Sequence, residues 1–151
     1  MALFVLEGVD GVGKTTLANL LAKIYNAGIV HATRETPNTW EWFRGLFDLA
    51  KEKNLILDRA FWGQFVYQKP DERVLSFEQL HDLEHSLEVE GGKLIYVTAN
   101  KEDIESRLVA RSEKLSLPLE ELIDHYRFLI ELSECPVIIY NTSNGGVTVW
   151  E

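Results

Sequence analysis

The stretch Gly8-Val9-Asp10-Gly11-Val12-Gly13-Lys14-Thr15 matches the pattern G-x-x-x-x-G-K-[ST] at every position. It follows the short apolar run Leu3-Phe4-Val5-Leu6, which has the character of a strand buried on both faces. Apolar residues then recur at helical spacing, at Leu17, Leu20, Leu21 and Ile24. A strand, a glycine loop and a helix in this order are the context in which the pattern binds phosphate.

This loop predicts a nucleoside triphosphate site. Glycines let the backbone curl so that successive N–H groups point at phosphate oxygens, and the following helix adds the positive end of its dipole. We expect Lys14 to reach the β- and γ-phosphates and the Thr15 hydroxyl to hold Mg²⁺. The predicted nucleotide-binding residues are those of the loop and of the first helical turn: Gly8, Asp10, Gly11, Val12, Gly13, Lys14, Thr15 and Thr16.

Length, charge and composition narrow the class of protein. At roughly 100 to 200 residues per domain, the 151 residues predict a single domain over residues 1–151. The net charge of -9 repels a phosphate backbone, so duplex nucleic acid is not an expected partner. No apolar run approaches the roughly 20 residues that span a bilayer, the first residues show no leader, and Cys135 has no cysteine to pair with. We therefore expect a cytoplasmic protein with no membrane partner.

Strand and helix patterns alternate after the loop. Strands are expected at 28–33, 55–58, 94–97 and 137–140, with a further short strand at 147–150. Helices are expected at 38–53, 61–68, 77–90, 102–112 and 119–133, the first of them with Trp42, Phe43, Leu46 and Leu49 facing inward. Such alternation is typical of a parallel sheet covered on both faces. The predicted fold class is α/β, a three-layer P-loop NTPase fold with a mainly five-stranded parallel sheet flanked by helices.

Proteins with this loop include GTPases, ATPases and kinases, and the rest of the chain discriminates among them. Asn100-Lys101-Glu102-Asp103 fits the N-K-x-D pattern by which GTPases read guanine, but no aspartate outside the loop has a glycine three residues later to sense the γ-phosphate. Its acidic residues suit a helix N-terminus instead. A motor ATPase needs oligomerisation elements for which 151 residues leave no room. A small kinase is the favoured interpretation, and a GTP-binding switch is the alternative from a different class.

Four segments carry a more specific pattern. Glu7 to Thr16 has the form E-G-x-D-G-x-G-K-T-T, and Arg34-Glu35-Thr36-Pro37 is similar to an R-E-P element. Asp58-Arg59 and then Val66-Tyr67-Gln68 are similar to D-R-Y-x-x-S-x-x-A-Y-Q, and the segment Arg107 to Arg111 resembles an arginine-bearing lid. In this order, the segments resemble the thymidylate kinase family of nucleoside monophosphate kinases.

The chain departs from that family's pattern at several positions. The family's tyrosine and serine are Ala60 and Gly63 here, and the segment between Pro37 and Asp58 is shorter than in typical members. The short strand expected at 147–150 stands where that family has its C-terminal helix. The resemblance therefore implies a shortened kinase that transfers a phosphoryl group from ATP to a deoxynucleoside monophosphate such as thymidylate. A deoxynucleoside, or a modified base or sugar within a larger molecule, is the alternative acceptor.

Charged residues at strand ends suit phosphoryl transfer independently of the resemblance. Asp58 ends an apolar strand beside the loop, where a carboxylate holds Mg²⁺ or its waters. Its neighbour Arg59, and Arg34 after the second strand, would bind an acceptor phosphate. Arg107 and Arg111 lie one turn apart on a helix that would close over the phosphates and exclude water. The predicted catalytic residues are Lys14, Asp58, Arg59, Arg107 and Arg111.

The base and sugar of the acceptor have further candidate contacts. Trp40 and Arg44 are four residues apart, so they share a helical face on which an aromatic plate and an arginine suit a planar base. Packing in the core is the equally weighted alternative for this pair. The resemblance implies that Asp10 lies near the acceptor sugar and that Gln68 contacts sugar or base. The predicted acceptor-binding residues are Asp10, Arg34, Trp40, Arg44, Arg59 and Gln68, and the metal candidates are Thr15 and Asp58. Nucleotides are the expected partners, ATP the donor and Mg²⁺ the cofactor, while pairing into a homodimer is left open.

Overall fold

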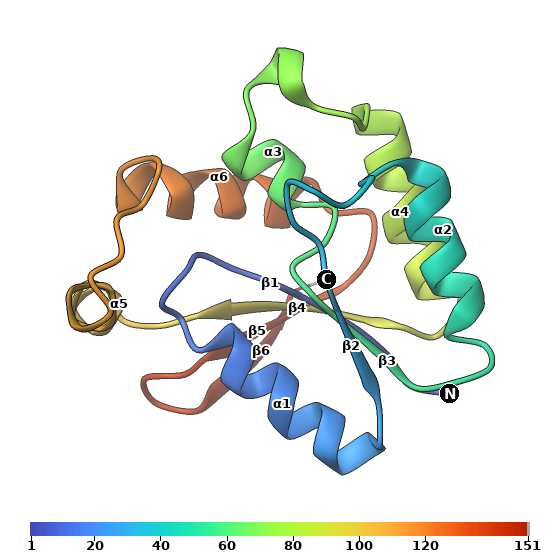
Figure 1. Ribbon diagram of the computed structural model, residues 1–151, viewed down its shortest axis with the longest axis horizontal. Coiled ribbons are helices and arrows are strands. Elements are labelled where there is room, and N and C mark those ends of the chain that lie inside the picture. The colour runs from blue at the N-terminus through green and yellow to red at the C-terminus, as the bar shows by residue number, and fades with distance from the viewer. Residues whose placement is uncertain (151) are drawn as a thin grey trace.

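The computed structural model describes residues 1–150, in which helices pack on both faces of a twisted sheet (Figure 1). The strands are β1 (Leu3–Glu7), β2 (Gly28–His31), β3 (Leu55–Asp58), β4 (Lys93–Thr98), β5 (Val137–Asn141) and β6 (Gly146–Trp150). The helices are α1 (Lys14–Tyr25), α2 (Trp40–Leu49), α3 (Gly63–Tyr67), α4 (Phe77–Val89), α5 (Lys101–Ala110) and α6 (Leu119–Leu132), with a 3₁₀ turn, η1 (Pro70–Glu72).

The six strands form one sheet in the order β2-β3-β1-β4-β5-β6. The first five strands are parallel, and β6 runs antiparallel to β5. The predicted α/β class, with a mainly parallel sheet flanked by helices, is confirmed, and the strand expected at 147–150 is the antiparallel edge strand. Because β1 lies between β3 and β4, the loops that leave the carboxyl ends of these three strands meet at one edge, where open α/β sheets bind ligands.

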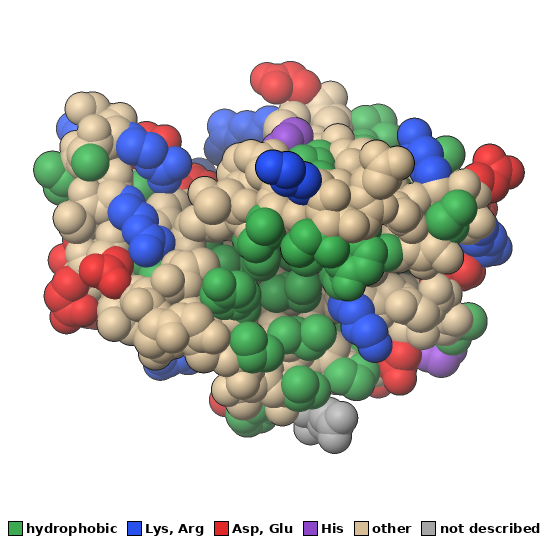
Figure 2. All heavy atoms as spheres, turned by 90° about the horizontal axis from the view of Figure 1, so that it is seen from below, with side chains coloured by type: hydrophobic (Ala, Val, Ile, Leu, Met, Phe, Trp, Pro, Cys, Tyr) green, Lys and Arg blue, Asp and Glu red, His purple; other side chains and the backbone are tan. Residues whose placement is uncertain are grey.

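The two faces of the sheet are covered unequally. Figure 1 shows α1 on one face, α2, α3, α4 and α6 on the other, and α5 beyond the carboxyl ends of the strands. On the side of α1 and β6, Figure 2 shows hydrophobic side chains gathered at the surface, and Val147, Val149 and Trp150 of β6 are exposed. Leu20 and Ile24, which belong to the apolar stripe predicted in α1, are also exposed. No helix within residues 1–150 is long and apolar enough to cross a bilayer.

The inward face of α2 differs from the one predicted. The helix begins at Trp40, because the Thr39 side chain caps it by accepting a hydrogen bond from the Trp42 backbone N–H at 3.1 Å. Phe43 and Phe47 are fully buried against Phe61, with ring centres 5.6 and 6.4 Å away. Leu49, expected to face inward, is 37% exposed at the end of the helix, and Phe47 takes the core position.

This correction predicts unequal costs for two substitutions in α2. Phe47→Ala should lower the free energy of unfolding by about 3 to 5 kcal/mol, because it leaves a cavity beside Phe61. Leu49→Ala should change it by less than about 1 kcal/mol, because that side chain is already at the surface. Urea denaturation of both variants tests the difference, and a larger loss for Leu49→Ala would contradict the assignment.

Candidate active site

The phosphate loop runs from the end of β1 at Glu7 to the start of α1 at Lys14. It passes so close to β4 that a Cβ atom on Gly8 would lie 2.3 Å from the carbonyl oxygen of Val97. Gly13, the N-cap of α1, has a φ of 90°, a left-handed conformation that favours glycine. The backbone geometry by itself therefore requires glycine at both positions, independently of phosphate binding.

Lys14 lies inside the curl of the loop. Its Nζ donates a hydrogen bond to the carbonyl oxygen of Gly8 at 3.3 Å, and only 8% of the residue is exposed. Burial lowers the pKa of Lys14, the charge of Arg59 lowers it further, and the carboxylates of Asp58 and Asp10 oppose the change. An ammonium group shielded from water, beside backbone N–H groups, is suited to neutralise the phosphates of a nucleotide.

Thr15 and Asp58 face each other at the mouth of the loop. The register of β1 and β3 sets Asp58 beside Leu6, and the Thr15 hydroxyl donates to Asp58 Oδ2 at 3.0 Å. Two hard oxygen ligands beside a phosphate-binding loop fit Mg²⁺, whose shell is completed by phosphates and waters. Their role as metal ligands stays a prediction. Among residues 1–150, no group of three or more His, Cys, Asp and Glu side chains could hold a metal by itself.

His31 is a site residue that the sequence did not single out. It ends β2 next to Asp58 of β3, and its Nδ1 lies 3.2 Å from Asp58 Oδ2. It lines the same hollow as Lys14, Thr15 and Arg59. The sequence pattern put His31 inside the strand expected at 28–33 and gave no signal for it. The structure ends β2 at His31, and the pairing of β2 with β3 sets it beside Asp58.

Arg59 joins the phosphate loop to the segment after β3. Its φ of 69° is uncommon for a residue other than glycine. Its Nη2 donates to Asp10 Oδ1 at 2.5 Å, and its guanidinium carbon lies 4.7 Å from the centre of the Tyr67 ring. The ion pair and the stacked ring hold the guanidinium at the border between the loop and a neighbouring cavity.

That cavity has a volume of about 250 Å³ and is lined by three cations from separate segments, Arg34, Arg59 and Lys114. Lys114 follows α5 and was not predicted as an acceptor contact. Four of the predicted acceptor residues, Asp10, Arg34, Arg59 and Gln68, line this cavity. The other residues around it are Ala32, Thr33, Asn38, Ala60, Gly63, Gln64, Tyr67 and Ser116.

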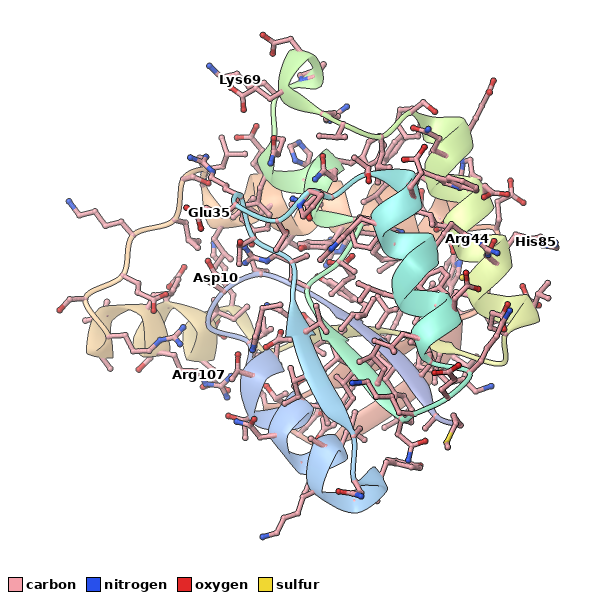
Figure 3. The ribbon with its side chains drawn as sticks, turned by 45° about the vertical axis from the view of Figure 1, so that its right-hand side comes forward. Asp10, Glu35, Arg44, Lys69, His85 and Arg107 are labelled. Carbon is pink, nitrogen blue, oxygen red and sulfur yellow. The ribbon has the colours of Figure 1, made fainter. Side chains whose placement is uncertain are left out.

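Trp40 and Arg44, the predicted base platform, do not line this cavity. The Trp40 indole N–H donates to Asp82 Oδ2 on α4 at 2.5 Å, and the Arg44 guanidinium lies 6.0 Å from the Trp40 ring centre. Figure 3 shows Arg44 toward α4 and Asp10 at the phosphate loop. The helical spacing correctly put the pair on one face, but that face meets α4, so the geometry favours a packing role.

Gln64 is a second residue that the sequence did not single out. It lies on α3 with 4% of its surface exposed, and it lines the cavity. Its Oε1 accepts a hydrogen bond from the Val74 backbone N–H at 3.2 Å. Since a backbone N–H needs an oxygen opposite it, this bond fixes the orientation of the amide. The amide nitrogen, a donor, is therefore the group available to a ligand.

Arg107 of α5 and Arg111, which follows this helix, lie on the other side of the phosphate loop. Arg107 Nη1 donates to the carbonyl oxygen of Gly11 at 3.1 Å and to Thr142 Oγ1 at 3.2 Å, and the Thr142 hydroxyl donates to the carbonyl oxygen of Val12 at 2.6 Å. Arg107 and Arg111 line a second cavity of about 560 Å³ with Gly11, Gly13, Thr16, Leu17, Leu20, Ala110, Tyr140 and Thr142. The labelled Arg107 points toward the start of α1 in Figure 3. This volume lies in the range of small-molecule sites.

The N-K-x-D segment has structural contacts. Asp103 Oδ2 accepts a hydrogen bond from the Ser143 hydroxyl at 2.5 Å, and Asn100 Oδ1 accepts one from Asn141 Nδ2 at 3.3 Å. Lys101 forms an ion pair with Glu120 at 2.5 Å. These bonds fasten the start of α5 to its surroundings, as expected for a helix N-terminus.

Glu7 lies directly behind the phosphate loop and is fully buried. Its Oε2 accepts a hydrogen bond from the Trp62 backbone N–H at 2.7 Å, whereas its Oε1 has no hydrogen-bond partner among residues 1–150. Burial raises the pKa of Glu7 from 4.5 to about 7, although backbone N–H groups and the charges of Arg59 and Lys14 lower it. Its carboxyl group therefore changes charge near neutral pH.

No protein-family model and no curated protein matches the chain. Solved structures match its fold. The YorR protein from Bacillus subtilis, solved in complex with phosphorylated GDP, is 25% identical over 95% of this chain and 86% of its own, with a TM-score of 0.77. Deoxyadenosine kinase from M. mycoides is 18% identical over 92% of this chain and 90% of its own, with a TM-score of 0.57. Thymidylate kinase from Candida albicans is 16% identical over 93% of this chain and 84% of its own, with a TM-score of 0.56.

These likenesses settle the fold at the level of a superfamily. The chain has the fold of the P-loop kinases. Within that fold, the thymidylate kinase is one of several similar structures that differ in the acceptor they are named for. The matches favour a kinase over the GTP-binding switch, and they do not single out the thymidylate kinases among kinases of this fold.

The raised pKa of Glu7 predicts how stability depends on pH. The folded state binds the Glu7 proton more tightly than the unfolded state does. The contribution of this proton to the stability of the fold is therefore complete below about pH 4.5 and is lost as pH rises through about 7. Between pH 5 and 8 this group should remove about 2 to 3 kcal/mol from the free energy of unfolding. Denaturation of the wild type and of Glu7→Gln at both pH values measures it, and a difference between the two proteins that is independent of pH would contradict it.

Proposed function

We propose that the protein transfers the γ-phosphoryl group of ATP to a deoxynucleoside monophosphate of the thymidylate type. The observation that carries this proposal is the cavity lined by Arg34, Arg59 and Lys114, which opens directly beside the phosphate loop. Three cations around a small cavity suit an acceptor that already bears a phosphate, since a neutral acceptor would bring no anion to them. Asp10 and Arg59 line both this cavity and the hollow at Lys14 and Thr15, so the two phosphates would meet there.

The donor would lie across the phosphate loop, with its base and sugar in the cavity beside α5. Lys14 and the loop N–H groups would hold its β- and γ-phosphates, and Arg111 lines both that cavity and the mouth of the loop. Mg²⁺ bound by Thr15 and Asp58 would neutralise charge on the phosphates. ATP as the donor, Mg²⁺ as the cofactor and a cytoplasmic location are parts of this proposal. So is a single domain over residues 1–151, of which Glu151 lies outside the described residues.

The chain's own residues would act by positioning and by neutralising charge. An acceptor phosphate held by Arg34 and Arg59 would have an oxygen in line with the γ-phosphorus. As that oxygen bonds to phosphorus and the bond to the β-phosphate oxygen breaks, Lys14 would stabilise negative charge on the transferring group. Arg107 of α5 and Arg111, which follows this helix, would exclude water, so that the group reaches the acceptor instead of being hydrolysed.

The orientation of the Gln64 amide favours a base that presents a carbonyl oxygen to it. The bond from Val74 occupies its oxygen, so its amide nitrogen would donate to an acceptor atom of the base. Thymine and uracil present a carbonyl oxygen where cytosine presents an amino group. This preference agrees with the resemblance of the loop and the Asp58-Arg59 segment to thymidylate kinases.

Two other acceptors remain alternatives. The likeness to deoxyadenosine kinase, whose structure holds dATP, keeps a deoxynucleoside in view. The YorR structure contains phosphorylated GDP, so a guanine nucleotide belongs in the acceptor panel. A modified base or sugar in a larger molecule is the other alternative. Ala60 and Gly63 are small residues on the wall of the cavity and leave room for a larger acceptor. Formation of ADP with ATP, Mg²⁺ and a panel of dTMP, dUMP, dCMP, dGMP and thymidine distinguishes them.

Lys14→Ala should abolish most of the transfer. The lysine charge would act where the transferring group becomes most negative, so we expect kcat to fall by at least about a hundredfold. Lys23→Ala is the matched control, because Lys23 is exposed on the last turn of the same helix. A folded Lys14→Ala protein with near-normal turnover would refute the proposed function.

The monophosphate should be a better acceptor than the nucleoside. Thymidine would leave the forks of Arg34 and Arg59 without a phosphate, so its kcat/KM should be about ten- to a hundredfold below that of dTMP. Arg34→Ala should reduce the difference in kcat/KM between dTMP and thymidine. Equal use of thymidine would move the function to a deoxynucleoside kinase, and use of neither would favour an acceptor within a larger molecule.

A further inference from the structure

The fully buried carboxyl group of Glu7 is poorly compensated. One oxygen, Oε1, has no hydrogen-bond partner, and the side chain forms no ion pair within the described residues 1–150. An uncompensated carboxyl group is costly in a protein interior, where an apolar side chain of the same size would be tolerated. Its one strong bond therefore indicates what the residue does.

That bond holds the turn that follows β3. The turn is anchored to the end of β1 at two points, because the Arg59 N–H donates to the Leu6 carbonyl oxygen at 2.9 Å and the Trp62 N–H donates to Glu7 Oε2 at 2.7 Å. Between these anchors Arg59 has a φ of 69°, a left-handed conformation that is uncommon for a residue other than glycine. Leu6 and Glu7 thus fix the backbone of residues 59–62 through these two hydrogen bonds.

The conformation of this turn decides where the Arg59 side chain points. Its guanidinium pairs with Asp10 at 2.5 Å and stacks on Tyr67 in the wall of the acceptor cavity. If the turn relaxed to a common conformation, the Cα–Cβ bond of Arg59 would rotate and carry the guanidinium away from that wall. The hydrogen bond of Glu7 is therefore linked to the acceptor site through the backbone.

We propose that Glu7 is a positioning residue, which holds the turn at Arg59 through the Trp62 N–H and so aims the Arg59 guanidinium at the acceptor phosphate. The proposal rests on the proposed function for the identity of the ligand. It requires a hydrogen-bond acceptor at position 7 with the reach of a glutamate. It does not require the negative charge, because Oε2 accepts the bond in the carboxylic acid as well.

The chain offers a matched control at the same tryptophan. The Trp62 indole N–H donates to Oε2 of Glu84, a second buried carboxyl group on α4, at 3.0 Å. Glu84 also contacts His81 and the backbone N–H of Glu134, and it does not line the acceptor cavity. The same substitution at Glu84 therefore disturbs Trp62 and the core without releasing the turn.

Three substitutions of Glu7 separate hydrogen bonding from charge. Glu7→Gln keeps the acceptor oxygen and its reach, Glu7→Asp keeps the charge but shortens the reach, and Glu7→Met keeps only the volume. We expect Glu7→Asp and Glu7→Met to raise KM for dTMP about tenfold or more, with KM for ATP changed by less than about twofold. Glu7→Gln should retain the wild-type KM for dTMP. Glu84→Met should lower the melting temperature and leave both KM values unchanged.

A measurement without turnover separates this proposal from the proposed function. The NMR signal of the Arg59 Nε–H group, identified by its loss in Arg59→Lys, should move in Glu7→Asp and Glu7→Met and keep its place in Glu7→Gln. If Glu7→Met does not fold, the comparison of Asp with Gln decides. An unmoved signal or an unchanged KM for dTMP in Glu7→Asp would overturn the positioning role, as would a Glu7→Gln variant as impaired as Glu7→Asp. Absence of transfer to every monophosphate by the wild type would refute the proposed function alone.

Discussion

The backbone that leaves β1 passes β4 so closely at Gly8 that no larger residue fits between it and the carbonyl oxygen of Val97. This close approach forces the chain to curl before α1 can begin. The carbonyl oxygen of Gly8 accepts hydrogen bonds from Lys14 Nζ at 3.3 Å and from the Tyr126 hydroxyl of α6 at 3.2 Å. The loop is therefore fixed to the sheet, to its own helix and to α6, and both cavities are built against it.

The charge of the molecule is distributed unevenly over its surface. The net charge is -9, yet five of the cations lie around the phosphate loop, at the carboxyl edge of the sheet: Arg34, Arg59, Lys114, Arg107 and Arg111. A local group of cations is sufficient for a small anion, because screening limits the reach of the acidic surface to about 8 to 10 Å. The same surface disfavours a long polyanion, which would extend beyond the group. This distribution suits nucleotides as ligands.

Two carboxyl groups act on Arg59 from different directions. Asp10 pairs with the guanidinium, and Glu7 holds the backbone turn below it through Trp62. The first contact lies at the cavity and would rearrange when a phosphate arrives. The second is fully buried, so it is shielded from the ligand and from salt. In the proposed function, the Arg59 guanidinium would exchange Asp10 for a phosphate while its backbone stays in place.

The sequence by itself determined the phosphate loop, the α/β class, and the positions of Asp58 and Arg59 at a strand end. These features depend on neighbours in the chain, where glycine geometry and hydrophobic periodicity act over a few residues. Only the tertiary structure decided which distant residues meet. It brought His31 to Asp58, placed Gln64 and Lys114 around the cavity of Arg34 and Arg59, and turned Trp40 toward α4. Helical spacing shows that two residues share a face, but which face meets a ligand depends on strand order and helix packing, and these arise from contacts between segments far apart in the chain.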